Sequence, residues 1–320
     1  MTAEFRCKLA SALLIVKPLP LSSSVYLSTV ALPPSSTSLL IAIAVTPAFA
    51  LLIALTRLLM FEIPVDKFAR VNESQFIDSL TTNKPGLAVL QFANHEVGTQ
   101  QPINPIYKKC QELNIPLFVD ATMTAGIINL GSDWDVLLLK PATWGAPIGI
   151  DVLVVKRNVR FKSILLDDGR ENHKFSNNVS IPHAVAIGAS LEEITLNRSE
   201  IAKSLGTLIN DLRQLLSSNL DITLLGDPVA RVPHVLAAVI KDIDGEALAS
   251  GLSKKGFAIS SGSSCTPDQV KPSHVLAAMG FEDQINIRIS LPFDAKDADI
   301  LDFVSALTQT IKDLKASAGV

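Results

Sequence analysis

Three side chains that could do chemistry lie far apart in the sequence: Cys265, Asp120 and Arg288. Cys265 lies in the small-residue stretch "SSGSSCT", where a thiolate could act as a nucleophile. Asp120 ends the apolar run "PLFVD", so it could face a ligand crevice at the end of a parallel strand or cap the following turn. Arg288 lies within "INIRISL" and needs a carboxylate from the protein or from a ligand, because a buried unpaired charge is costly.

The bulk composition argues against several classes of function. A formal net charge of −3 gives no electrostatic reason to expect a nucleic-acid partner. The three cysteines (Cys7, Cys110 and Cys265) are widely spaced and odd in number, which favours reduced thiols in the cytoplasm over a disulfide framework. The sequence contains no cysteine pair and no His-x-x-x-His spacing, so we expect no metal site.

One apolar stretch, residues 38–61, allows two interpretations. It carries no charge until Arg57 and approaches the ~20 residues that a membrane span needs. Pro47, near its middle, is tolerated in a span but does not favour one. The alternative is a buried strand at 39–44, a turn and a buried helix at 48–59. Because the uninterrupted apolar run is short, we favour the buried arrangement over a membrane anchor.

From Glu62 onward, short apolar runs alternate with segments of helical spacing. This alternation predicts an α/β fold with a mostly parallel, helix-covered sheet. The expected strands are 86–93, 116–121, 134–139 and 150–157, and the expected helices are 74–80 and 105–114, the first capped by Asn72 or Ser74.

A long helical stretch, residues 181–219, leads into a second, smaller domain of mixed strands and helices. The sequence leaves undecided whether this helix is broken near Asn197. We therefore expect three parts: a divergent apolar segment at 1–61, a large α/β domain at 62–204, and a small C-terminal α+β domain at 205–320 that carries the Cys265 loop.

Five stretches together resemble one known family: "ANHEVGTQQPI", "PLFVDATMTAG", "WGAPIGIDVLVVKR", "SSGSSCTPDQVKPSHVLAAMG" and "INIRISL". They are similar to the cysteine desulfurases, class V aminotransferases with the fold-type I architecture of pyridoxal-phosphate enzymes. The resemblance runs from about Glu62 to the C-terminus, and the family's N-terminal strand and helix have no counterpart in it, which implies a shortened member. It also implies pyridoxal phosphate as cofactor, L-cysteine as substrate, a sulfur-acceptor protein in iron–sulfur cluster assembly, and a homodimer.

The same resemblance implies roles for individual residues. Asp120 falls where the family's aspartate pairs with the pyridine nitrogen, which keeps the ring an electron sink. Asn94 and His95 fall on the loop that lines the cofactor. Arg288 falls where the substrate carboxylate binds, and Cys265 falls on the nucleophile that takes the sulfur as a persulfide.

The resemblance fails at positions that hold the cofactor. Thr143 stands at the Schiff-base lysine and Ala142 at the histidine before it. Met123 replaces a glutamine that contacts the phenolic oxygen, Thr46 replaces the histidine that stacks on the ring, and Asn178 replaces a threonine that reaches the phosphate. Threonine cannot form an imine, so the family's catalytic route is in doubt.

Lys140 is the nearest amine in the sequence. In an extended strand it would lie roughly 10 Å from position 143 and on the opposite face, because side chains alternate. Pro141 disfavours a helical arrangement that would bring it closer. We therefore do not expect Lys140 to substitute.

Three functional hypotheses follow. The first is an active cysteine desulfurase that holds its cofactor differently. The second is a non-catalytic homologue that acts as a partner or carries a persulfide on Cys265. The third is a membrane-anchored member that uses residues 38–61.

Overall fold

The structure is a computed structural model that describes residues 13–17, 29–30, 59–162, 180–261, 273–281, 284 and 286–318. The chain forms two compact units. Unit 1 comprises Met1–Pro64, Val71–Phe92 and Gln101–Thr195, and unit 2 comprises Val65–Arg70, Ala93–Gln100 and Leu196–Val320. The strand and helix expected at 39–44 and 48–59 lie outside the described residues, except for Leu59, which begins a strand.

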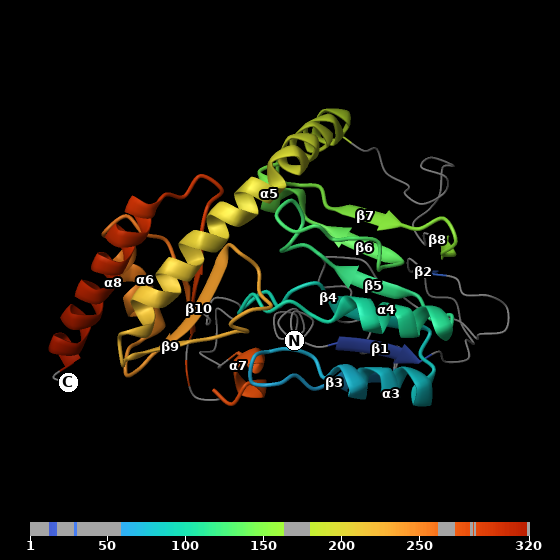
Figure 1. Cartoon of the computed structure of the whole chain (residues 1–320), viewed down its shortest axis with the longest axis horizontal. Helices are drawn as coiled ribbons and strands as arrows, with labels where there is room; N and C mark the ends of the chain where they lie inside the picture. Colours follow the sequence, from blue (N-terminus) through green and yellow to red (C-terminus); the bar gives the residue numbers. More distant parts are fainter. Residues whose placement is uncertain are drawn as a thin grey trace. The chain divides into compact units, whose positions relative to one another are not determined.

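Unit 1 contains a six-stranded sheet, shown in Figure 1. Its order is β3 (Leu59–Ile63), β1 (Leu13–Lys17), β4 (Leu87–Gln91), β5 (Leu117–Asp120), β6 (Val136–Leu139) and β7 (Val152–Val155). β4, β5 and β6 pair in parallel, and β1 is antiparallel to both β3 and β4. β3 therefore runs with β4, β5 and β6, so four of the six strands share one direction while β1 and β7 oppose them. The predicted α/β class and the four predicted strands are confirmed. A separate antiparallel ribbon joins β2 (Thr29–Val30) to β8 (Phe161–Lys162).

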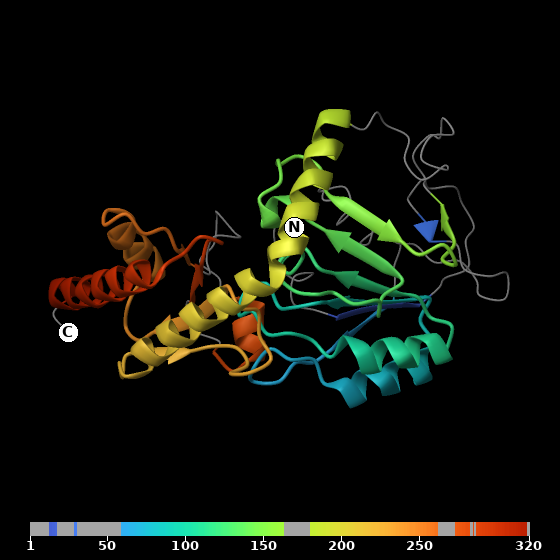
Figure 2. The same ribbon diagram turned by 45° about the horizontal axis from the view of Figure 1, so that its top comes forward.

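Two helices, α3 (Glu73–Asn83) and α4 (Ile103–Glu112), lie side by side along this sheet in Figures 1 and 2. Asn72 caps α3, because its side chain accepts a hydrogen bond from the amide of Gln75. Helical spacing places the buried residues of each helix on one face: Phe76 and Leu80 in α3, and Ile103, Ile106 and Cys110 in α4.

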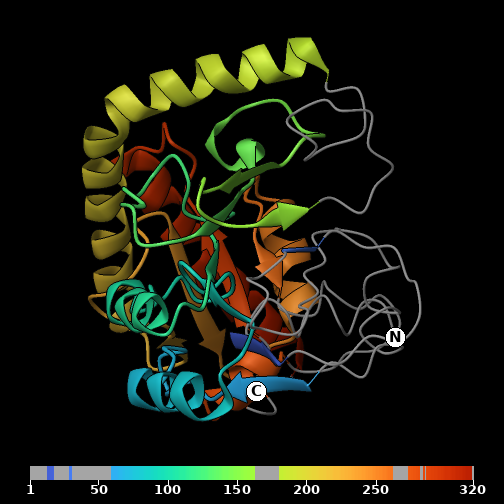
Figure 3. The ribbon, with the colours of Figure 1, turned by 90° about the vertical axis from the view of Figure 1, so that its right-hand side faces the viewer.

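The long helix α5 (Ile181–Ser217) passes from unit 1 into unit 2. Its 37 residues, Asn197 included, are all helical, and its ribbon can be followed in Figure 3. Among the helices that the structure describes, none has both the length and the apolar character required to cross a membrane.

Unit 2 contains an antiparallel sheet with the order β11 (Ser260–Ser261), β12 (Asn286–Ser290), β10 (Val235–Ile240) and β9 (Ile222–Leu224). Helices α6 (Gly245–Ser253) and α8 (Asp297–Ala318) share one apolar core with α5 and this sheet, and the short α7 (His274–Ala278) belongs to another. β10 is buried along its whole length because its residues alternate between the two cores. Leu236, Ala238 and Ile240 join the helical core, and Ala237 and Val239 join the core of α7.

Candidate functional site

The carboxyl ends of β4, β5 and β6 meet at one edge of the unit 1 sheet, because these neighbouring strands are parallel. Asp120 ends β5 at this edge. Its Oδ1 accepts hydrogen bonds from the amide of Thr122 at 2.9 Å and from the hydroxyl of Thr122 at 2.6 Å. Asp120 therefore caps the turn, as one of the two interpretations expected. Its contact with a pyridine nitrogen stays a prediction.

Position 143 lies in a turn that follows β6 at the same edge. Pro141–Trp144 forms a 3₁₀ helix, so the extended conformation expected between Lys140 and Thr143 was wrong. Proline fits the first turn of a helix, where its missing N–H would have no partner in any case, and Gly145 ends the turn with a left-handed φ of 86°. The carbonyl of Lys140 accepts hydrogen bonds from the Thr143 amide at 2.9 Å and the Thr143 hydroxyl at 2.6 Å.

Trp144 anchors this turn to the rest of unit 1. The residue is only 3 % exposed, and its indole N–H donates to the hydroxyl of Ser190 at 3.2 Å. Gly126 packs so closely that a Cβ there would lie 2.5 Å from the Trp144 Cβ. The turn is thus fixed in place by packing, and Ala142 and Thr143 are half-buried within it.

This edge does not fit a covalently tethered pyridoxal phosphate. The position that the resemblance aligns with the Schiff-base lysine carries the hydroxyl of Thr143, and that hydroxyl is already bonded within its own turn. The side chain of Lys140 is exposed. Lys156 follows β7 at the other end of the sheet, where its amine donates to Tyr107 and to the carbonyl of Ser132.

In unit 2, residues 93–100 form a closed loop built around Asn94. Asn94 is 2 % exposed, and its Oδ1 accepts from the amides of Glu96 at 2.9 Å and Val97 at 3.1 Å. The backbone N–H of Asn94 donates to the Thr99 carbonyl at 2.8 Å, and its backbone carbonyl accepts from the Gly98 N–H at 2.9 Å. Asn94 therefore shapes the loop, and its predicted contact with a cofactor is still a prediction.

The structure brings two of the predicted site residues together, Arg288 and His95. Arg288 lies on β12 opposite Ala237 and Ser260, and its Nη1 donates to the His95 carbonyl at 2.9 Å. The buried Nε of Arg288 has no hydrogen-bond partner in the described part of the chain. Donors of this guanidinium thus remain for a carboxylate.

Three residues around Arg288 were given no role by the sequence: Glu96, Ser273 and His234. The Ser273 hydroxyl donates to Glu96 Oε2 at 2.5 Å. Burial raises the pKa of Glu96, against the lowering effects of the Ser273 hydrogen bond and the Arg288 charge. Burial, assisted by Arg288, lowers the pKa of His234 to about 4. The sequence did contain a signal for two of these residues, because Glu96 and Ser273 both lie inside motifs on which the resemblance rests.

Three other predicted site residues, Cys265, Asn178 and Thr46, lie outside the described residues. Cys110 is buried in α4, where burial and the nearby Asp135 raise its pKa to about 12. A thiol in such surroundings is a poor nucleophile, which leaves the sequence preference for Cys265 in place.

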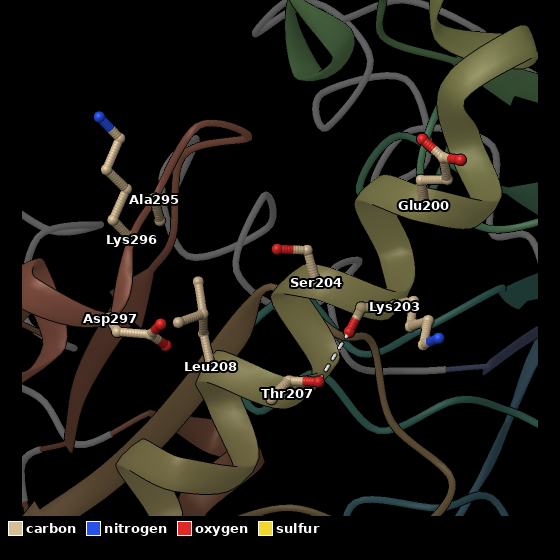
Figure 4. Close-up of a pocket in the computed structure, with 8 residues that line it drawn as sticks. All are labelled: Glu200, Lys203, Ser204, Thr207, Leu208, Ala295, Lys296 and Asp297. Atoms are coloured by element: carbon tan, nitrogen blue, oxygen red, sulfur yellow. Dashed lines mark hydrogen bonds between the residues drawn. The ribbon is translucent and has the colours of Figure 1, made fainter.

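A cavity of about 540 Å³ lies elsewhere in unit 2, between α5 and the start of α8 (Figure 4). Its lining contains none of the site residues predicted from the sequence. It is formed by Glu200, Lys203, Ser204, Thr207, Leu208, Ala295, Lys296 and Asp297. Within the described ranges, no group of His, Cys, Asp and Glu side chains could hold a metal ion.

Comparison with known proteins identifies relatives across most of the chain. Residues 48–303 match the family model "Aminotransferase class-V". The chain is 31% identical over 247 residues to a cysteine desulfurase of Trichormus azollae, covering 75% of this chain and 62% of the relative. It is 32% identical over 230 residues to cysteine desulfurase IscS 1 of Archaeoglobus fulgidus, covering 69% and 58%. The matched region thus spans about 60% of these curated relatives.

Solved structures share the fold. A NifS-like protein superposes with a TM-score of 0.74 at 22% identity, covering 83% of this chain and 72% of that one. The apo structure of a cysteine desulfurase from Thermococcus onnurineus gives a TM-score of 0.73 at 16% identity, covering 84% and 70%. The predicted PLP-dependent transferase fold is thereby confirmed.

Proposed function

The chain belongs to the class V aminotransferase family and is a member of the cysteine desulfurases within it, and on that premise we propose that it carries sulfur without tethering pyridoxal phosphate. In this proposal, Arg288 binds the carboxylate of a cysteine-derived persulfide, and Cys265 accepts its outer sulfur. The acceptor of that sulfur is another protein, as in iron–sulfur cluster assembly. A cytoplasmic homodimer is part of the same proposal.

One observation supports the proposal: the hydroxyl of Thr143, which aligns with the family's Schiff-base lysine, is bonded to the Lys140 carbonyl at 2.6 Å. A hydroxyl cannot form an imine, and it cannot serve as the amine base that moves the substrate's α-proton. The proposed carboxylate-binding side differs, because Arg288 is half-buried and its Nε has no partner in the described part of the chain. In this proposal, the residues aligned with the cofactor site lack the amine that forms the imine, whereas the residue aligned with the substrate-carboxylate site is still an arginine.

The chemistry that remains is transfer of a sulfane sulfur. The Cys265 thiolate attacks the outer sulfur of a donor persulfide. A new S–S bond forms on Cys265, the S–S bond of the donor breaks, and the donor leaves as a thiolate, so no external oxidant or reductant is needed. Arg288 binds the donor's carboxylate through a bidentate contact, which an arginine makes better than a lysine.

Mass spectrometry of the purified chain, mixed with cysteine persulfide, tests the proposal. We expect one added sulfur on the peptide that contains Cys265, removed by dithiothreitol and absent in Cys265→Ser. Arg288→Lys should slow the transfer at low donor concentration and less at saturation. Sulfur on Cys110 or Cys7 in place of Cys265 would contradict the proposal.

A second candidate, an active cysteine desulfurase, is favoured by one specific observation. Asp120 ends β5 at the edge where parallel strands bind ligands, as a partner of a pyridine nitrogen would. Such an enzyme would hold pyridoxal phosphate without an imine to Thr143. Sulfide released from L-cysteine by the chain with added cofactor, and lost in Asp120→Asn, would establish it.

A further inference from the structure

A side-chain hydrogen bond joins two residues of unit 2 that are 177 positions apart in the sequence. The Ser273 hydroxyl donates to Glu96 Oε2 at 2.5 Å. Ser273 also caps α7, since its oxygen accepts from the amide of Val275 at 3.1 Å. The serine therefore has two functions, as helix cap and as donor to a half-buried carboxylate.

The residue next to Glu96 holds Arg288. The His95 carbonyl accepts from Arg288 Nη1 at 2.9 Å, and the Glu96 amide is fixed by Asn94 Oδ1 at 2.9 Å. Residues 95 and 96 share a peptide bond, so they cannot move independently. A change that frees the Glu96 side chain from Ser273 therefore also loosens the acceptor of the guanidinium.

Glu96 also acts on Arg288 through its charge. Burial raises the pKa of Glu96, and the nearby positive charge of Arg288 acts against that rise. No direct ion pair joins Glu96 and Arg288 in the described part of unit 2. Of the titratable groups on neighbouring elements, His234 precedes β10 and its pKa is lowered to about 4, so it adds no cation at neutral pH. His274 begins α7 and His95 lies in the loop itself.

We propose that Glu96 is a positioning and specificity-determining residue for carboxylate binding at Arg288. Through Ser273 it fixes the loop whose His95 carbonyl holds the guanidinium. Its charge partly neutralises Arg288 and so weakens the attraction for a second carboxylate. This inference rests on the role that the proposed function gives to Arg288.

The positioning role of Glu96 is tested without ligand, by measuring the rate at which the Arg288 Nε proton exchanges with solvent. The NMR signal of this proton is assigned by its loss in Arg288→Lys. Ser273→Asp keeps a good helix cap but replaces the donor with a like charge, so we expect the Arg288 proton to exchange about tenfold faster. Ser273→Thr keeps both cap and donor and should match the wild type. In the double variant E96Q/S273D, a glutamine N–H can donate to the aspartate, and slow exchange should return.

The charge half is tested with L-alanine, which has the required carboxylate and no thiol, by calorimetry from about pH 5 to about pH 8. The wild type should bind more tightly as pH falls, because a protonated Glu96 no longer competes for Arg288. Glu96→Gln keeps an acceptor for Ser273 and loses the charge. We expect it to bind about three- to tenfold more tightly at about pH 8 and to lose the pH dependence. Glu200→Gln, on the exposed face of α5, is the matched control.

Each outcome decides between the alternatives. If the Arg288 Nε proton exchanges at the wild-type rate in S273D, or as fast in the double variant as in S273D, the positioning role is overturned. Ser273 is then only a helix cap. If Glu96→Gln binds alanine no more tightly than the wild type, the charge role is overturned. If no variant binds alanine, the carboxylate role of Arg288 in the proposed function fails together with the charge role, and the NMR cycle still decides on positioning.

Discussion

The hydroxyl of Thr143 lies 2.6 Å from the carbonyl oxygen of Lys140, to which it donates a hydrogen bond. The bond closes a 3₁₀ turn that Pro141 begins and the buried Trp144 anchors. The residue that would have to form an imine is therefore part of a locally satisfied turn. In the proposed function, a chain with this turn keeps the family fold without a covalent link to the cofactor.

The first prediction concerns the restoration of that amine. Thr143→Lys removes the hydrogen bond to Lys140 and places an amine at the imine position on a turn that packing already fixes. We expect borohydride to trap added pyridoxal phosphate on this lysine in the variant. Thr143→Ser, which keeps the hydroxyl, is the control and should trap none. If Thr143→Lys also traps none, losses elsewhere on the cofactor side suffice to exclude the cofactor.

The second prediction concerns a glycine that supports the loop of Asn94 and His95. Gly226 has a φ of +79°, and a Cβ there would lie 2.5 Å from the carbonyl oxygen of Val97. Gly226→Ala should lower the free energy of unfolding by about 2 to 4 kcal/mol, through backbone strain and the clash with Val97.

Gly188→Ala is the matched control for Gly226→Ala. Gly188 lies in α5, and a Cβ there meets nothing within 4 Å. Alanine is the better helix former, so this change should raise the free energy of unfolding by about 0.5 to 1 kcal/mol. Urea unfolding of both variants gives the comparison, and equal effects of the two substitutions would contradict the prediction.

The third prediction concerns pH and the buried His234. Its pKa in the folded protein is about 4 against an ordinary value of 6.5, so the unfolded chain takes up a proton first as pH falls. The stabilising contribution is complete above about pH 6.5 and is lost as pH falls toward 4. The shift corresponds to about 3 kcal/mol. His234→Gln should flatten the pH dependence of urea unfolding in this window, and an unchanged slope would count against it.

The fourth prediction concerns Asp135, which holds the first residue of β5, at the end of the strand opposite Asp120. Its carboxylate accepts from the Leu117 amide at 2.9 Å and from Gln111 Nε2 at 3.0 Å. Asp135→Ala leaves the buried amide of Leu117 without its partner, at a cost of about 1 to 3 kcal/mol. Asp133→Ala, on the half-buried neighbouring turn, removes a hydrogen bond from the side chain of Asn104 and is the control for thermal unfolding. Similar losses in both variants would show that Asp135 has no special role.

The sequence predicted the elements whose local pattern is strong. Strands such as Leu117–Asp120 were found because continuous apolar runs bounded by turn residues are typical of strands buried on both faces. Asn72 was among the predicted caps because its side chain suits that position. Local patterns of this kind need no knowledge of distant contacts.

The sequence could not give features that depend on distant partners. The turn at Pro141–Trp144 was missed because its stability comes from packing of Trp144 against Gly126 and Ser190. Glu96 had no predicted role because its partner Ser273 lies 177 residues away. A hydrogen bond between such distant positions leaves no spacing pattern to detect.

The most direct test of the central claim is mass spectrometry of the purified chain after incubation with pyridoxal phosphate and reduction with borohydride. With Thr143 at the imine position, we expect no pyridoxyl group on any lysine peptide and no yellow absorbance band before reduction. A pyridoxyl group found on one specific lysine at stoichiometric cofactor, and on no lysine of the unfolded chain, would contradict the account.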